Sequence, residues 1–329
     1  MFHRFAVACV PFCLFAVAAQ AASFTTFDPS KSTGTMPAAV NAAGTVTGFY
    51  TTKSSPAHGF VRSAAGGIVS FDVPGSGATQ PAGIDAKGRI CGAYQDGGGN
   101  RLGFVRQPDG TIKSFSIAHA SEVVPSAIDA VSGVTGSYIQ GGIPHGFLRS
   151  VKGKITKFDY PGATATEPTA INAAGQVAGI YIDAGSLVHS FIRAASGSFL
   201  SFDAPGGTGR TIAARISPDG TVTGYFRDDG NVVHGFLRTP GDAITTFDPA
   251  GSVSTVPVSI NASNTIAGTY KTGDGVSHGF LRTVVGHITK FSDPDAVDTT
   301  HTSDISNRGV ITGNFVDSTG FRHGFVRSK

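Results

Sequence analysis

One unit of about 44 residues occurs seven times along the chain and leaves little sequence outside it. Its clearest mark is a short segment that resembles His-Gly-Phe and ends in arginine, with successive copies 43 to 45 residues apart. The copies are HGFVR at 58, LGFVR at 102, HGFLR at 145, HSFIR at 189, HGFLR at 234, HGFLR at 278 and HGFVR at 323. A period of this length is typical of proteins built from repeated supersecondary units.

Each unit contains four short segments with the composition of β-strands. The first two are exemplified by AIN at 170–172 and QVAGIY at 176–181, and the last two by HGFLR at 145–149 and ITKFD at 155–159. Gly, Asn, Asp and Pro bound these segments, as expected for strands joined by turns. No segment has ten residues of helical periodicity. Four strands in 40 to 50 residues are the size of one blade of a β-propeller.

The order of segments at the two ends favours a ring. Beyond residue 21, the first repeat segment is a fourth-strand segment, FTTFDP, whereas the last one is a third-strand segment, HGFVRSK. In an open stack both would have unpaired edges, which invite aggregation. If they pair, they complete the seventh blade. We therefore predict an all-β fold, a single closed seven-bladed β-propeller with four short antiparallel strands per blade.

The first 21 residues have the pattern of a secretory leader. A basic start, MFHR, precedes an apolar run and a small-x-small cleavage site at Ala19-Gln20-Ala21. This pattern indicates a signal peptide and not a membrane span. We predict a leader at 1–21, a propeller at 22–329, and a secreted or periplasmic protein. Cys91 is the only cysteine beyond the leader, so the propeller must fold without disulfides.

The charge balance bears on partners. The formal net charge is +3, there are only two glutamates, and no basic run occurs. These features argue against nucleic acid or an anionic membrane as a partner. We expect a monomer without a membrane span, whose partner is an extracellular glycan or protein.

A histidine and an aspartate recur 14 residues apart. In a hairpin of HGFLR and ITKFD, the register places Gly146 opposite Phe158 and His145 opposite Asp159. Where Leu102 replaces the histidine, Ser116 replaces the aspartate, and His278 is followed at the same distance by Ser292. Pairs kept or lost together are expected to touch. The predicted pairs are His58 with Asp72, His145 with Asp159, His189 with Asp203, His234 with Asp248 and, across the closed ring, His323 with Asp28.

Three interpretations of these pairs can be compared. A shared metal fails because equivalent strands of neighbouring blades lie about 10 Å apart, whereas ligands lie about 2 Å from an ion. Catalysis requires one site and a nucleophile, but the pair recurs in most units and none supplies a nucleophile consistently. The third interpretation is structural: a carboxylate satisfies a partly buried imidazole and fixes the hairpin register. We therefore name no catalytic residue.

The repeat resembles a known family. The H-G-F motif, the IN-x-x-G-x-V-x-G segment and the leader together are similar to bacterial HAF-type extracellular repeat proteins, which carry His-Ala-Phe where this chain has His-Gly-Phe. The resemblance covers all seven units. This chain departs from the family in lacking Trp and in its FDxPG segment. The resemblance implies export and a repeat fold, and it transfers no catalytic residue.

In a repeat protein, function is expected where the pattern fails. Two loops before a first strand depart most from the others, SIAHASEVVP at 116–125 and SDPDAVDTTHTSD at 292–304. Oxygen ligands of the second loop could hold Ca²⁺ or bind sugar hydroxyls, and whether any metal binds is left open. The alternative for this loop is a solvated acidic segment. The candidate ligand-binding residues are His119, Glu122, Asp295, Asp298 and His301.

Three function classes remain. The first is a secreted binding module for carbohydrate or another extracellular ligand. The second is a propeller-type polysaccharide lyase or hydrolase, and the third is a structural or adhesive extracellular protein. An enzyme would bring titratable groups together at one place, whereas a multivalent lectin would repeat similar pockets in several blades. We predict the first class, with enzymatic activity left open.

Overall fold

The described part of the chain consists of β-strands joined by turns and loops. The structure, a computed structural model, describes residues 22–53, 57–131 and 133–328; the predicted leader at 1–21 lies outside them. All regular elements among these residues are strands. No helix in the same residues is long and apolar enough to cross a membrane.

The described residues form 28 strands in chain order. They are β1 (Ser23–Phe27), β2 (Gly34–Val40), β3 (Val46–Thr51), β4 (His58–Arg62), β5 (Ile68–Phe71), β6 (Ala78–Ile84), β7 (Ile90–Gln95), β8 (Arg101–Arg106), β9 (Ile112–Phe115), β10 (Glu122–Asp129), β11 (Gly133–Gln140), β12 (Ile143–Arg149), β13 (Ile155–Phe158), β14 (Ala165–Ile171), β15 (Val177–Ile182), β16 (Val188–Arg193), β17 (Phe199–Phe202), β18 (Thr211–Ile216), β19 (Val222–Arg227), β20 (Val233–Arg238), β21 (Ile244–Phe247), β22 (Ser252–Ile260), β23 (Ile266–Thr272), β24 (Ser277–Arg282), β25 (Ile288–Phe291), β26 (Thr299–Ile305), β27 (Ile311–Val316) and β28 (Arg322–Ser328).

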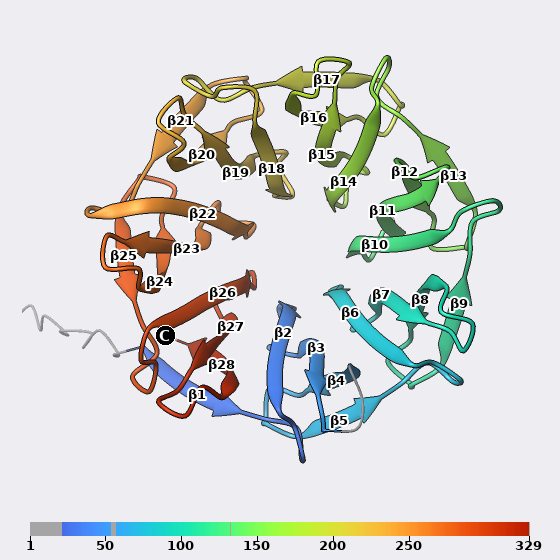
Figure 1. The fold of residues 1–329 in the computed structure, drawn as a ribbon, viewed down its shortest axis with the longest axis vertical. Helices are drawn as coiled ribbons and strands as arrows, with labels where there is room; N and C mark the ends of the chain where they lie inside the picture. The colour runs from blue at the N-terminus through green and yellow to red at the C-terminus, as the bar shows by residue number, and fades with distance from the viewer. Residues whose placement is uncertain (1–21, 54–56, 132, 329) are drawn as a thin grey trace, which may run out of the picture.

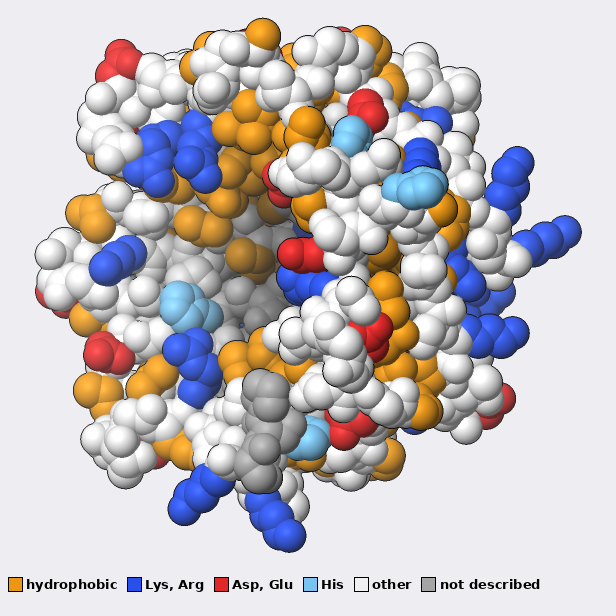
Figure 2. Space-filling model, turned by 45° about the vertical axis from the view of Figure 1, so that its right-hand side comes forward, with side chains coloured by type: hydrophobic (Ala, Val, Ile, Leu, Met, Phe, Trp, Pro, Cys, Tyr) orange, Lys and Arg blue, Asp and Glu red, His pale blue; other side chains and the backbone are white. Residues whose placement is uncertain are grey.

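The strands assemble into antiparallel groups of four. Strands β2 to β5 form one such group, and the same order repeats along the chain. In the last group β26, β27 and β28 are joined by β1, which pairs with β28 from Ser23 opposite Ser328 to Phe27 opposite Gly324. Figure 1 shows the groups side by side around a common centre, with β2, β6, β10, β14, β18, β22 and β26 innermost. The molecule is hollowed in the middle of the view in Figure 2.

The predicted hairpin register is confirmed, whereas the predicted start of the first strand is wrong. Gly146 lies opposite Phe158 and Arg149 opposite Ile155, as expected. The first strand was expected near 170–172, but β14 begins at Ala165 and passes through Pro168. A register shift between Pro168 and Ala170 leaves Thr169 without a ladder partner, so a bulge directly follows the proline; prolines within sheets are typically found at such bulges or on edge strands.

A phenylalanine at the end of each outermost strand joins one group to the next. Phe71 on β5 meets Phe104 on β8 edge to face, with ring centroids 6.1 Å apart. The guanidinium of Arg106 lies 4.8 Å from the centroid of the same Phe71 ring. Phe104 is fully buried, as are its equivalents in the other groups. The arginine over the preceding phenylalanine recurs as Arg62/Phe27, Arg149/Phe115, Arg193/Phe158, Arg238/Phe202, Arg282/Phe247 and Arg327/Phe291.

The glycine of the repeated motif makes room for that phenylalanine. A Cβ added at Gly279 would lie 2.2 Å from the ring of Phe291, so a side chain there displaces a core ring. We expect Gly279→Ala to lower the free energy of unfolding by about 1–3 kcal/mol through overpacking. Urea denaturation measures the change.

Gly77 provides the matched control for this substitution. A Cβ added at Gly77 would meet nothing within 4 Å. We expect Gly77→Ala to change the free energy of unfolding by less than about 0.5 kcal/mol. Equal losses in the two variants would show that the glycine at 279 is not required by ring packing.

Candidate functional site

The repeated histidines lie against the aspartates 14 residues further along. His145 Nδ1 lies 3.0 Å from both carboxylate oxygens of Asp159. The ring also stacks on Tyr138, with centroids 5.1 Å apart. The other contacts join His58 to Asp72 at 2.8 Å, His189 to Asp203 and His234 to Asp248 at 2.7 Å, and His323 to Asp28 at 2.6 Å.

The aspartates themselves lie outside the strands, which corrects the prediction that the histidine and the aspartate face each other in the ladder. Strands β5 and β17 each end one residue earlier, so Asp72 and Asp203 follow them and begin the next loop. The chain leaves the ladder there because the next backbone N–H is taken by a threonine, as when Val73 donates to Thr79. The side chains of Asp72 and Asp203 are each 44% exposed.

Exposure limits what these pairs contribute to stability. The carboxylates of Asp159 and Asp248 are also exposed, at 48% and 37%, whereas Asp28 is 25% exposed. Solvent screens ion pairs of this kind, and their net contribution is small. The contact therefore orients the imidazole at the end of the hairpin, while the register is set by the ladder between Gly146 and Phe158.

A buried threonine belongs to the same network, and sequence reasoning missed it. The Thr35 hydroxyl donates to Asp28, and that of Thr255 donates to Asp248. In other groups the hydroxyl accepts a backbone N–H of the same loop, as Thr211 does from Ala204. Six of the described loops before a first strand are therefore tied down by the threonine, and in two of them the aspartate shares that role.

Three of the histidines have a second carboxylate. His234 Nε2 lies 3.2 Å from Asp228, and the same contact joins His189 to Asp183 and His323 to Asp317. The hydrogen bond to Asp248 raises the pKa of His234 most, burial opposes it, and Asp228 raises it further. Asp183, Asp228 and Asp317 each accept a backbone N–H group within their own turn. The structure shows that they also bind the imidazole.

One group has lost the whole network. Leu102, Ser116 and Val123 occupy the positions of the histidine, the aspartate and the threonine. Tyr94 lies opposite Leu102 in the ladder, where other groups stack the equivalent aromatic ring on a histidine, as Tyr138 does on His145. The tyrosine ring lines a cavity instead.

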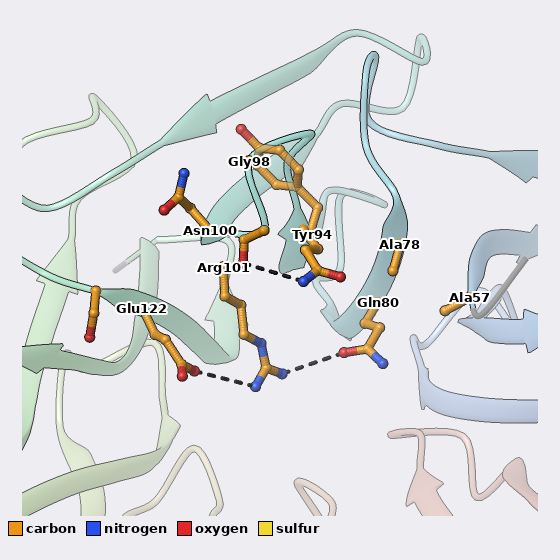
Figure 3. A pocket seen from close by; sticks show the side chains of 11 residues that line it. Ala57, Ala78, Gln80, Tyr94, Gly98, Asn100, Arg101 and Glu122 are labelled. Atoms are coloured by element: carbon orange, nitrogen blue, oxygen red, sulfur yellow. Dashed lines mark hydrogen bonds and ion pairs between the residues drawn. The ribbon is translucent and has the colours of Figure 1, made fainter. Parts of the chain in front are cut away.

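The cavity beside Tyr94, here called the Arg101 cavity, has a volume of about 550 Å³. Figure 3 shows the Arg101 guanidinium between Gln80 on β6 and Glu122 on β10. Its Nη2 donates to Gln80 Oε1 at 3.4 Å, and its Nη1 lies 3.8 Å from Glu122 Oε2. The described residues that line it are Ala57, Ala78, Gln80, Tyr94, Gln95, Gly98, Gly99, Asn100, Arg101, Ser121 and Glu122.

The backbone places these side chains at the junction of two groups. Arg101 begins β8 and Glu122 begins β10, and the two residues are parallel partners in the sheet. The turn before Arg101 is fixed by Asp96, which accepts the backbone N–H groups of Gly98 and Asn100. The ionic contact is long and both side chains are more than 40% exposed. Their hydrogen-bonding groups are therefore open to a ligand.

Of the two candidates in the first variant loop, only Glu122 lines the cavity. It lies on β10 and not in the loop, because the strand begins earlier than expected. His119 is exposed in the preceding turn with a φ of 66°, and it is absent from the lining. Gln80, Tyr94 and Arg101 were missed, although the loss of histidine at Leu102 marked the unit.

The candidates in the second variant loop lie apart from the Arg101 cavity. Asp295 and Asp298 are exposed loop residues, whereas His301 is on strand β26 and partly buried. Burial lowers the pKa of His301, and Arg322 lowers it further. Across residues 22–53, 57–131 and 133–328, no group of three or more His, Cys, Asp or Glu is arranged to hold a metal ion. Calcium binding by this loop stays a prediction.

Comparison with known proteins supports the type of fold and gives no function for the site. No protein-family model and no curated protein matches the chain. Among solved structures, a streptogramin B lyase matches at 14% identity and TM-score 0.60, covering 93% of this chain and 98% of its own. Virginiamycin B lyase from Staphylococcus aureus matches at 14% identity and TM-score 0.61, covering 94% and 100%. A structure from a study of two prolyl endopeptidases matches at 13% identity and TM-score 0.64, covering 90% and 48%. Identity this low supports a β-propeller fold alone.

The second carboxylate beside His234, that of Asp228, makes the stability of the protein depend on pH. A histidine whose pKa is raised by folding stabilises the protein below its unfolded pKa, and the contribution is lost as pH rises through the folded pKa. The Val232 amide holds the pKa of Asp228 below its ordinary value, so Asp228 stays ionised at mild pH. We expect Asp228→Asn to lower the His234 pKa, measured by NMR titration, and to reduce the melting temperature more at about pH 5.5 than at about pH 8.5.

Asp229→Asn is the matched control, because Asp229 lies in the same turn without a contact to His234. We expect it to leave the His234 pKa unchanged. A pH-independent loss of melting temperature in Asp228→Asn would contradict the assignment.

Proposed function

We propose that the protein is an exported, closed seven-bladed β-propeller that binds one saccharide in the Arg101 cavity. Three observations support the ring: 28 strands divide evenly into groups of four, β1 pairs with β28, and β2 contacts β26, β27 and β28. The propeller neighbours agree with it. The composition of residues 1–21 supports export.

The chemistry of the Arg101 cavity suits a polyhydroxylated ligand. Its volume of about 550 Å³ falls within the roughly 300–1,000 Å³ of small-molecule sites. Arg101 supplies N–H donors, and Glu122 and Gln80 supply oxygen acceptors, while Tyr94 adds an aromatic ring. Because the cation and the carboxylate balance, the cavity favours sugar hydroxyls over a strongly charged ligand. The observation that carries the proposal is that this cavity coincides with the one group that lost the His–Asp–Thr network.

A single site is expected and not a ring of equivalent ones. At the position of Arg101, the other units have Ala57, Pro144, Val188, Val233, Ser277 and Arg322. At the position of Glu122, they have Gly34, Ala78, Ala165, Arg210, Ser254 and Thr299. No other unit combines a cation with a carboxylate at these two positions, so we expect one ligand per chain.

Ligand binding can be tested by melting-temperature shifts with neutral, N-acetylated and uronic-acid disaccharides. We expect a neutral or N-acetylated sugar to give the largest shift, with one site by calorimetry. Arg101→Val and Glu122→Ala, which install residues found at the same positions of other units, should each weaken binding about ten-fold, the loss of one or two charge-assisted hydrogen bonds.

Arg322→Val is the matched control, the same substitution at the equivalent position of another group. We expect it to leave affinity within about two-fold. Equal loss in Arg101→Val and Arg322→Val would contradict the site, and the absence of any shift would contradict saccharide binding. Shortening of an oligosaccharide during incubation would instead support the lyase or hydrolase alternative.

A further inference from the structure

A second, smaller cavity lies at the opposite end of β8 from the Arg101 cavity. It has a volume of about 100 Å³, and four basic side chains line it. Arg89 comes from the turn between β6 and β7, Lys113 from β9, Arg149 from the end of β12, and Lys152 from the turn that follows. No aspartate or glutamate is among the described residues that line it. We call it the basic cavity.

Three of these four cations are departures from the repeat. At the position of Arg89, the other six units have Thr45, Gly133, Gln176, Thr221, Thr265 and Val310. The equivalents of Lys113 are Thr25, Val69, Thr156, Leu200, Thr245 and Thr289, and those of Lys152 are Ala65, Asp109, Ser196, Gly241 and Val285. None of them is basic. Three unrelated departures, on three segments, thus bring basic side chains to one cavity, where Asp85 pairs with Arg89 and Lys113 and Lys152 add positive charge beside Arg149.

Arg89 is held in place by the protein itself. Its Nε donates to Asp85 at 2.6 Å and its Nη2 donates to the Asp129 carbonyl at 3.2 Å. The Arg89 side chain is only 15% exposed. A guanidinium fixed in this way loses little conformational freedom when a ligand binds.

Arg149 is positioned by stacking and has hydrogen bonds to spare. Its guanidinium lies 4.9 Å from the centroid of the Phe115 ring. Its equivalents Arg62, Arg106, Arg193, Arg238 and Arg282 donate to the carbonyl of the following residue at 3.3 Å. Arg149 has no such bond to a residue that the structure describes, so its amino groups are available. Burial lowers the pKa of Arg149, and the charge of Arg89 lowers it further.

The size and charge of the basic cavity define its ligand. A volume of about 100 Å³ is too small for a sugar ring site of roughly 300 Å³ or more, yet it exceeds the share of about 30 Å³ that one water takes. Arginines recognise oxyanions through pairs of N–H groups. We propose that the basic cavity binds one tetrahedral oxyanion, a sulfate or a phosphate group, either free or as the ester of a sugar.

Calorimetry and melting temperature at low ionic strength test this second site. The probes are sodium phosphate, sodium sulfate, glucose 6-phosphate and glucose 6-sulfate, with sodium chloride at equal ionic strength as the reference. We expect saturable binding of a phosphate or sulfate probe to one site, and a rise in melting temperature above that given by chloride. Tighter binding of an ester would identify an esterified sugar as the source, and tighter binding of an inorganic ion would identify the free anion.

Two double variants with the same charge change separate the site from general electrostatics. Lys113→Thr with Lys152→Ser installs residues found at the same positions of other units, so folding should be retained. We expect it to weaken oxyanion binding about ten-fold or more. Lys87→Ala with Lys154→Ser removes two nearby lysines that do not line the cavity, and we expect a change of less than about two-fold.

Two results would overturn the proposal. One is the absence of saturable binding by all four oxyanion probes. The other is an equal loss of affinity in the two double variants, which would show that the general positive charge of this face attracts the anion. Because the Arg101 cavity is left intact by both variants, saccharide binding there should persist and is scored separately.

Discussion

The packing of one phenylalanine between neighbouring groups of strands is the interaction on which the rest of this structure depends. In six of the seven groups, the ring at the end of the outermost strand lies over the motif glycine of the strand beside it, as Phe291 does over Gly279; in the seventh, Ser190 takes the place of the glycine opposite Phe202. The same ring is covered by an arginine of the next group, as Arg106 covers Phe71. The glycine, the phenylalanine and the arginine of the repeat are therefore parts of one contact. This contact places each group at a fixed position beside the next, and both cavities lie at such junctions.

The polar part of the repeat serves the same scaffold. In five groups, histidine, aspartate and threonine tie the loop before a first strand to the preceding hairpin, as in the His323, Asp28 and Thr35 set. Where Leu102, Ser116 and Val123 replace them, apolar packing with Ile117 and Phe104 takes over. The tyrosine of that group then has no imidazole partner and lines the Arg101 cavity. The unit released from the repeated network is thus the unit in which a ligand site can form.

The sequence predicted the strands and the hairpin register because both follow from local patterns. Period, turn residues and the alternation around Gly146 and Phe158 are readable within one unit, and the structure agrees. The candidate site was predicted only in part. Glu122 was found from its variant loop, but Arg101 begins a strand 21 residues earlier, and only the parallel contact between β8 and β10 brings the two together. Contacts between units depend on the placement of whole groups, which no single segment encodes. The bulge beside Pro168 was also missed, because the first strand was predicted to begin only at Ala170, beyond the proline.

The central claim is that the repeated residues build the scaffold and that ligand binding occurs where the repeat fails. The most direct test is to restore the repeat at that place with Leu102→His, Ser116→Asp and Val123→Thr together. Affinity is then measured for the saccharide that shifts the melting temperature most. The restored imidazole would stack on Tyr94 and occupy its side of the Arg101 cavity. We expect the melting temperature to be kept and saccharide affinity to fall about ten-fold, whereas His145→Leu, which breaks the network elsewhere, leaves affinity unchanged. Unchanged affinity in the restored protein, or its loss in His145→Leu, would contradict the claim.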